Sequence, residues 1–126
     1  DEKPFVIAEG DILGNETHEI IGGAVAELWH LASEVTSSIR YHHFPEKSPQ
    51  QYRTMCAILN VAEFSLCNTR LGSFEGSISE PELSVWNSAG ISPQEKGHIF
   101  SIAETENERA EKFLTPFDFT SALRSI

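Results

Sequence analysis

The chain has 126 residues, which is enough for one modest hydrophobic core and short for two independent domains. Hydrophobic residues make up 40% and charged residues 22% of the sequence, as in soluble globular proteins. The formal net charge of -10 repels phosphate backbones and anionic lipid headgroups, so we expect neither a nucleic-acid nor a membrane partner. The sequence contains no membrane-spanning apolar run and no signal-peptide pattern, and we therefore expect a cytoplasmic location.

The N-terminal third of the sequence predicts one amphipathic helix after a short helix or tail at residues 1–13. Asn15 and Thr17 are both residue types that cap helices. Gly22 and Gly23 lower the helix propensity and indicate a close approach by another helix or by a cofactor, of which helix packing is the commoner. The residues expected to form the inward face of this helix are Ile21, Val25, Leu28 and Trp29.

The middle of the chain predicts two further helices. One begins near Ser33 and ends at Phe44-Pro45, because the residue before a proline avoids the helical region. The second begins at Ser48-Pro49, where a capping serine, a proline and a glutamine follow the usual start pattern. It is expected to run to about Gly72. Its predicted apolar stripe consists of Tyr52, Met55, Cys56, Leu59, Ala62, Glu63 and Leu66.

The last third predicts a loop at residues 72–79, a short helix at 82–86 and a long helix that starts at Ser92-Pro93 and ends near Leu114. Residues 115–126 mix aromatic and polar residues and are expected to be a tail. Strand-like alternation appears nowhere for long. The sequence thus predicts an all-α helical bundle, with a helical domain at residues 1–79 and an appended helical segment at residues 80–126.

Three histidines and one glutamate form the constellation that bears on chemistry: His18, His42, His43 and Glu63. Imidazole and carboxylate groups are common ligands of transition metals, and they can bind one ion when they converge from separate helices. His18 and His42 continue the apolar stripes of their helices and are expected to point inward, as is Glu63. Spacing alone leaves a second interpretation open, because buried histidines more often hydrogen-bond a carbonyl or carboxylate than bind a metal.

The remaining reactive or aromatic residues are expected to be structural. Cys56 and Cys67 would lie about 16 Å apart along one helix, too far for a disulfide, and are expected to be buried thiols rather than nucleophiles. Trp29 and Trp86 are expected to anchor the core.

The order of these motifs resembles the second half of the HDOD domain, a relative of the HD phosphohydrolases and HD-GYP phosphodiesterases. The similarity covers residues 9–68 and is strongest in ILGNETHEIIGGAVAELWHLASEVTSSIRYHH. Further along, AILNVAEFSLC resembles a helix of the family that carries Ala-Asp, with Ala62-Glu63 at that position. The matching positions of the first stretch are Leu13, Gly14, His18, Gly22, Trp29, Leu31, Ile39, His42 and His43.

The sequence also departs from the HD pattern at positions that matter for catalysis. It contains no His-Asp pair, and no Asp-Gly-x-Gly-Tyr-Pro run follows His43. Glu63 stands where HD enzymes have a metal-binding aspartate, and its additional methylene displaces the carboxylate. Metal-assisted hydrolysis requires several fixed ligands and an open position for water. The resemblance therefore implies vestigial metal ligands at His18, His42, His43 and Glu63, and no cofactor.

From this resemblance we expect a bacterial signal-transduction module of partial HD-like fold that regulates through protein–protein contacts or self-association, without catalysis. Two alternatives remain open. The first is a metal-dependent HD-type phosphohydrolase acting on a nucleotide or cyclic dinucleotide, for which iron or manganese is the expected cofactor. The second is a plain helical interaction domain, in which the histidines would be scattered and exposed.

Overall fold

The computed structural model describes residues 5–14, 16–69 and 78–115. The helices are α1 (Phe5–Leu13), α2 (His18–Leu28), α3 (Ser33–Tyr41), α4 (Arg53–Cys67), α5 (Leu83–Ser88) and α6 (Lys96–Leu114), with 3₁₀ turns at Pro45–Lys47, Gln50–Tyr52 and Pro93–Glu95. This described part contains no strand, which confirms the all-α prediction. None of its helices is both long and apolar enough to span a membrane.

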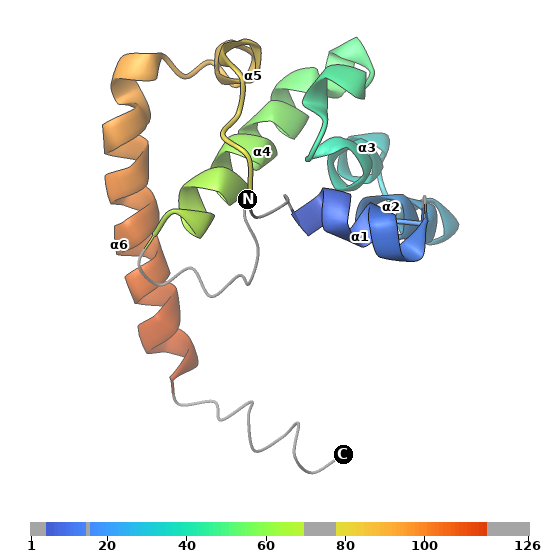
Figure 1. Cartoon of the computed structure of the whole chain (residues 1–126), viewed down its shortest axis with the longest axis horizontal. Helices are drawn as coiled ribbons and strands as arrows, with labels where there is room; N and C mark the ends of the chain where they lie inside the picture. The colour runs from blue at the N-terminus through green and yellow to red at the C-terminus, as the bar shows by residue number, and fades with distance from the viewer. Residues whose placement is uncertain (1–4, 15, 70–77, 116–126) are drawn as a thin grey trace.

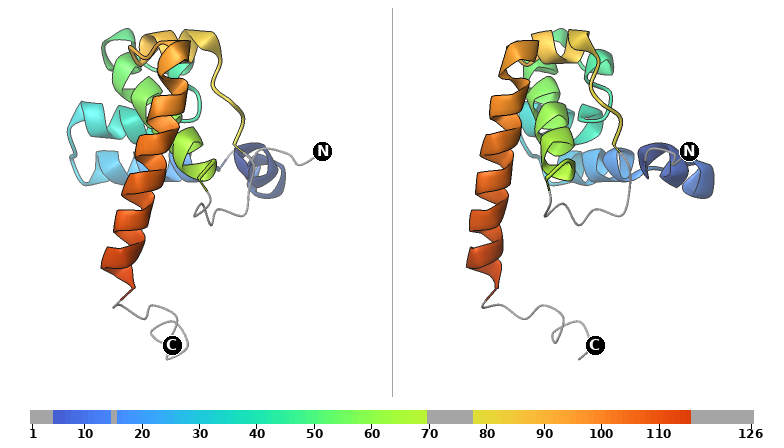
Figure 2. Two further views of the ribbon diagram at one scale, coloured as in Figure 1. Left: turned by 90° about the vertical axis from the view of Figure 1, so that its left-hand side faces the viewer. Right: turned by 60° about the vertical axis from the view of Figure 1, so that its left-hand side comes forward.

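Helix α4 lies at the centre of the arrangement (Figure 1). Helices α5 and α6 pack along one side of α4, and α3 packs along another side. Helix α2 packs against α3. Two further views show α6 running beside α4, with α5 across the top of the pair (Figure 2). Helix α4 therefore contacts two groups of helices that lie on different sides of it.

The main hydrophobic core lies between α4 and α5. It consists of Ala57, Val61, Phe64, Val85 and Trp86, with Phe100 of α6 packed against it. The indole nitrogen of Trp86 donates a hydrogen bond to the carbonyl of Pro81 at 3.1 Å, so its one polar atom is satisfied. This core joins residues on both sides of position 80, and the division into residues 1–79 and 80–126 stays a prediction.

Two similar start patterns in the sequence each begin a helix through a 3₁₀ turn, but only one of them forms the predicted capping box. At Ser92 the predicted capping box is present, because the Ser92 amide bonds the Glu95 carboxylate at 2.8 Å and the chain continues into α6. At Ser48 the chain also enters a 3₁₀ turn, Gln50–Tyr52, that continues into α4 at Arg53, but the predicted serine cap does not form. The Ser48 hydroxyl donates instead to the Pro45 carbonyl at 2.6 Å, which closes the preceding turn.

Helices α2 and α3 pack closely at the predicted glycines. A Cβ atom added at Gly22 would lie 2.9 Å from Cγ2 of Ile39, and one at Gly23 would lie 2.7 Å from Nε of Arg40. At Gly22 an added methyl group would displace the stiff Ile39 side chain, whereas at Gly23 the flexible end of Arg40 could shift, although its Cβ atom also lies close, at 3.2 Å. The close-packing interpretation of the glycine pair is therefore confirmed.

The predicted burial of α2 is wrong. The side chains of Ile21, Val25 and Leu28 are exposed, and Trp29 is 70% exposed instead of anchoring the core. The sequence pattern marks an apolar face correctly, but no described element covers that face. Trp86, by contrast, is buried as expected.

The buried face of α4 is rotated from the predicted stripe. Its buried residues are Cys56, Ala57, Asn60, Val61, Phe64 and Ser65. Met55, Leu59 and Leu66 belong to the predicted stripe, yet each is at least 40% exposed. The predicted stripe thus borders the buried face instead of forming it. The helix ends at Cys67, so the predicted continuation is wrong for residues 68–69, and residues 70–72 lie outside the described residues, as do residues 116–126 of the predicted tail.

Candidate histidine site

The four predicted site residues come from three helices. His18 begins α2, His42 and His43 directly follow α3, and Glu63 lies in the second half of α4. The end of α3 is fixed to α4 because the amide of Asn60 donates a hydrogen bond to the His42 carbonyl at 2.7 Å. This bond satisfies a carbonyl that the helix end leaves open, and it holds both histidines above α4.

The structure brings the three imidazoles together. The ring centroids of His42 and His43 lie 4.0 Å apart, those of His18 and His43 4.9 Å, and those of His18 and His42 5.5 Å. One nitrogen from each ring lies within 4.8 Å of the others. The burial is uneven, because the His43 side chain is 8% exposed whereas that of His18 is 41% exposed. His18 therefore lies at the open edge of the cluster and not inward as predicted.

Each imidazole has its second nitrogen beside an oxygen acceptor. Nδ1 of His18 lies 2.6 Å from Oε2 of Glu9, and Nδ1 of His43 lies 3.2 Å from Oε2 of Glu63. Nδ1 of His42 lies 2.7 Å from the Ile39 carbonyl. An oxygen at this position holds the proton on Nδ1 and leaves the lone pair on Nε2.

The contact between His18 and His43 joins two ring nitrogens. Their Nε2 atoms lie 2.9 Å apart. If both rings carry a proton only on Nδ1, two lone pairs face each other at this distance, which is repulsive. A proton on one of the two Nε2 atoms, or a cation placed where both lone pairs point, removes this repulsion.

The carboxylates around the cluster suit such a cation. Oε2 of Glu63 and Oε2 of Glu19 are both buried without a hydrogen-bond partner among the described residues, although each lies within 3.5 Å of an imidazole nitrogen. A buried carboxylate oxygen without a hydrogen bond is costly unless a positive charge compensates it. Two nitrogens that bind one transition-metal ion at about 2.1 Å and at right angles lie about 3 Å apart. The residues present thus fit a single metal ion bound by His18, His43 and His42, with Glu9 and Glu63 orienting the rings.

The ionisation of the cluster reflects the same contacts. Burial of His42, followed by the nearby charge of His43, lowers the pKa of His42. Burial alone would raise the pKa of Glu63, but the histidines, His43 foremost, outweigh it and the pKa of Glu63 falls below its ordinary value. The hydrogen bond from His18 likewise lowers the pKa of Glu9.

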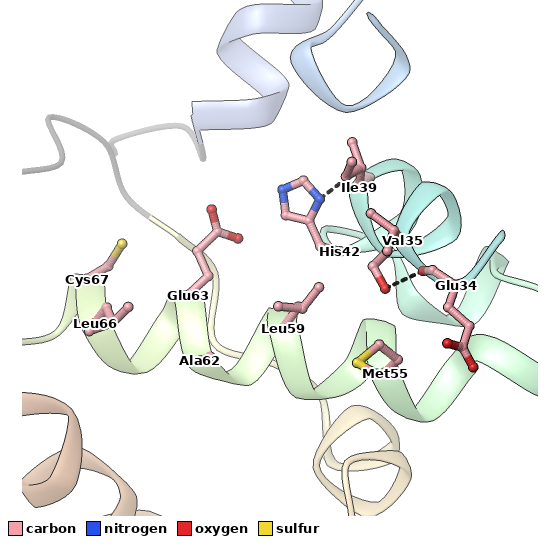
Figure 3. A pocket seen from close by; sticks show the side chains of 11 residues that line it. Glu34, Val35, Ile39, His42, Met55, Leu59, Ala62, Glu63, Leu66 and Cys67 are labelled. Atoms are coloured by element: carbon pink, nitrogen blue, oxygen red, sulfur yellow. Dashed lines mark hydrogen bonds between the residues drawn. The ribbon is translucent and has the colours of Figure 1, made fainter. Parts of the chain in front are cut away.

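A groove runs from this cluster between α3 and α4 (Figure 3). It has a volume of about 610 Å³. His42 and Glu63 point into one part of it, and Met55 and Glu34 lie toward the other end. The lining residues are Glu34, Val35, Ser38, Ile39, His42, Met55, Leu59, Ala62, Glu63, Leu66 and Cys67.

The sequence analysis missed two carboxylates of the site. Glu9 accepts hydrogen bonds from His18 through both its oxygens, and Glu19 lies beside the same ring, but neither has a spacing that would single it out.

The prediction of two buried thiols is correct for one cysteine and partly correct for the other. Cys56 is buried and Cys67 half-buried, and both are free thiols. Burial raises the pKa of each thiol, which disfavours the nucleophilic thiolate.

Comparison of the chain with models of protein families, with curated proteins and with solved structures gave no match. The likeness to HDOD domains therefore depends on the sequence motifs described above.

Proposed function

We propose that this chain is an HDOD-like regulatory module that acts through contacts with a protein partner and turns over no substrate. Its motifs are those of the C-terminal part of such a domain, and its histidine cluster is what remains of a metal site. In this proposal the partner binds to the helices around the cluster and not to the histidines themselves.

The observation that carries this proposal is the set of large apolar side chains that the segment from α2 to α4 exposes to solvent. Soluble monomers seldom expose a large apolar patch unless it is an interaction site. The net negative charge helps to keep a protein with exposed apolar side chains soluble in the absence of its partner. The large apolar residues of this region that are at least 37% exposed are Ile20, Ile21, Val25, Leu28, Trp29, Leu31, Val35, Met55, Ile58, Leu59 and Leu66.

The ligand set supports the absence of turnover. Among the described residues the cluster supplies three imidazoles, and Glu63 lies beside the Nδ1 atom of His43 at 3.2 Å and not among the candidate ligand atoms. A hydrolytic centre needs fixed ligands together with an open position for an activated water. No His-Asp pair exists anywhere in the sequence to add ligands.

One observation favours the alternative of a metal-dependent phosphohydrolase. The short distance between the Nε2 atoms of His18 and His43, with an oxygen beside each Nδ1, is the arrangement that metal-binding histidines adopt. A bound divalent ion would polarise a phosphoryl oxygen and lower the pKa of a bound water. The same gathering of imidazoles weighs against the plain helical interaction domain, since a scaffold gives no reason to bring three histidines together.

A hydrolysis assay distinguishes the two proposals. The purified chain is loaded with Fe²⁺ or Mn²⁺, its metal content is measured by elemental analysis, and turnover of bis(p-nitrophenyl) phosphate and of a cyclic dinucleotide is followed. We expect no turnover above that of a His42→Ala/His43→Ala variant. Turnover that depends on both the metal and the two histidines would establish the phosphohydrolase instead, whereas bound metal without turnover agrees with the regulatory role.

A further inference from the structure

The groove between α3 and α4 has the form of a site for a third helix. Its α4 wall repeats at Met55, Leu59, Ala62 and Leu66, which are separated by three or four residues and therefore share one side of the helix. Its α3 wall repeats at Val35, Ile39 and His42 in the same way. Two parallel rows of this kind leave between them the space that the apolar face of a packed helix fills.

The apolar side chains that line the groove are partly exposed, because no described element packs over them. Val35 is 45% exposed, Leu59 40% and Leu66 42%. The opposite side of α4 is closed, because Ala57, Val61 and Phe64 pack against α5 and α6. The open row runs from Met55 to Leu66, which at 1.5 Å per residue is roughly 16 Å along the axis and matches about three turns of an α-helix.

The charge of the rim identifies the kind of helix. Glu34 lies toward one end of the groove and Glu63 toward the other (Figure 3). No lysine or arginine is among the lining residues, and the whole chain carries a net charge of -10. A second copy of the chain would bring like charges to this surface, whereas a basic segment would be attracted to it.

We propose that the α3–α4 groove binds a basic amphipathic helix of a partner protein, with apolar side chains between Val35 and Leu59 and with lysine or arginine near Glu34 and Glu63. This inference rests on the proposed regulatory function and names the place and chemistry of its protein contact. Recognition of this type places anchors at positions i, i+3 or i+4, and i+7 of the bound helix in an apolar groove.

The test uses the full chain and a designed fluorescent peptide of about 14 residues, with leucine at i, i+4, i+7 and i+11 and lysine at both ends. Binding is measured by fluorescence anisotropy. A second peptide with glutamate in place of lysine tests the charge. We expect the basic peptide to bind and the acidic peptide to bind at least about tenfold more weakly, with a difference that shrinks at high salt.

A matched pair of variants locates the contact. Met55 in the groove and Ile102 on α6 are both 46% exposed, so Met55→Asp and Ile102→Asp add the same charge at equally open positions. Met55→Asp should weaken binding about tenfold or more, although its charge attracts the basic peptide. Ile102→Asp should leave the affinity unchanged. Glu34→Lys should weaken binding by roughly fivefold and improve binding of the acidic peptide. Circular dichroism establishes that each variant is folded.

Three results would overturn the proposal. Equal affinity of the Met55→Asp and Ile102→Asp variants would place the peptide on another face, and equal binding of the two peptides would remove the charge argument. Sedimentation showing a wild-type dimer that Met55→Asp dissociates would make a second copy the occupant. All of these leave the absence of hydrolysis, and hence the regulatory proposal, to stand or fall by its own assay.

Discussion

The two sides of α4 differ in how they are completed. Toward α5 the helix presents Ala57, Val61 and Phe64, which are covered by Val85 and Trp86. Toward α2 and α3 it presents an apolar row that stays open and a cluster of titratable groups joined by polar contacts. The first side owes its stability to burial of apolar area, and the second depends on hydrogen bonds and charge. The same helix thus has a covered apolar core on one side and an open apolar row on the other.

The two tryptophans give the largest expected contrast between the sides. Trp86 is 4% exposed, and Trp86→Ala should lower the free energy of unfolding by about 3–5 kcal/mol, because it leaves a cavity in the core. Trp29→Ala should change the free energy of unfolding by less than about 0.5 kcal/mol, since the side chain is already in solvent. Urea unfolding followed by circular dichroism measures both. Similar losses would mean that the face of α2 is covered in solution.

Substitution of two glycines tests the close packing of α2 against α3. Gly22→Ala should destabilise the fold by about 1–3 kcal/mol, because the new methyl group would meet Ile39 and push α3 from α2. The control is Gly97→Ala in α6, where no atom lies within 4 Å of the added Cβ. That variant should be stabilised by up to about 1 kcal/mol through helix propensity. Thermal unfolding of both variants provides the comparison, and a stable Gly22→Ala protein would refute close packing.

The asparagines provide a smaller contrast. Asn60→Ala removes the donor to the His42 carbonyl from a buried position and should cost about 1–3 kcal/mol in unfolding free energy. Asn107→Ala removes a bond to the Thr69 hydroxyl at a half-buried position and should cost less than about 1 kcal/mol. Chemical unfolding ranks the two. If Asn107 proved the more important, α6 rather than α3 would depend on polar bonding to its neighbours.

The smallest expected effect is a dependence on pH. His42 has a lowered pKa when folded, so the unfolded chain binds its proton first as pH falls below about 6.5, and stability declines. Glu63, whose folded pKa is also lowered, adds stability that is complete above its unfolded pKa and lost as pH falls through the folded value. The groups that face His42 are His18, His43 and Glu63.

Melting temperatures between pH 8 and pH 4 measure this dependence. We expect a fall toward acid that begins below about pH 6.5. His42→Gln should flatten the upper part of the curve. His98→Gln is the control, because His98 is exposed on α6, away from the cluster, and the profile should keep its shape. An unchanged profile in His42→Gln would show that His42 makes no linked contribution.

The elements were predictable from sequence where local chemistry decides them. The capping box at Ser92 and Glu95 works within four residues and formed as expected. At Ser48 the same reasoning placed the helix start within two residues but not the cap, because the Ser48 hydroxyl donates to the preceding Pro45 carbonyl. The buried face of α4 was misplaced because Asn60 and Ser65 are buried through hydrogen bonds that a hydropathy pattern does not register.

The site was predictable to the extent that motif spacing describes it. The order of His18, His42 and His43 anticipated their convergence, and Gly22 anticipated the close approach that allows it. The pattern could not show that the face containing Trp29 lacks a covering element, since an apolar stripe looks the same whether or not something packs on it. Glu9 escaped notice because its position relative to His18 depends on the turn between α1 and α2.

The link between Glu9 and His18 has a consequence for α1. Both oxygens of Glu9 engage His18, one at the main-chain nitrogen at 3.1 Å and one at the ring. Because the hydrogen bond from His18 lowers the pKa of Glu9, the carboxylate accepts both bonds while it is ionised and loses them when acid protonates it. The attachment of the N-terminal helix to the body would then weaken in an acidic compartment.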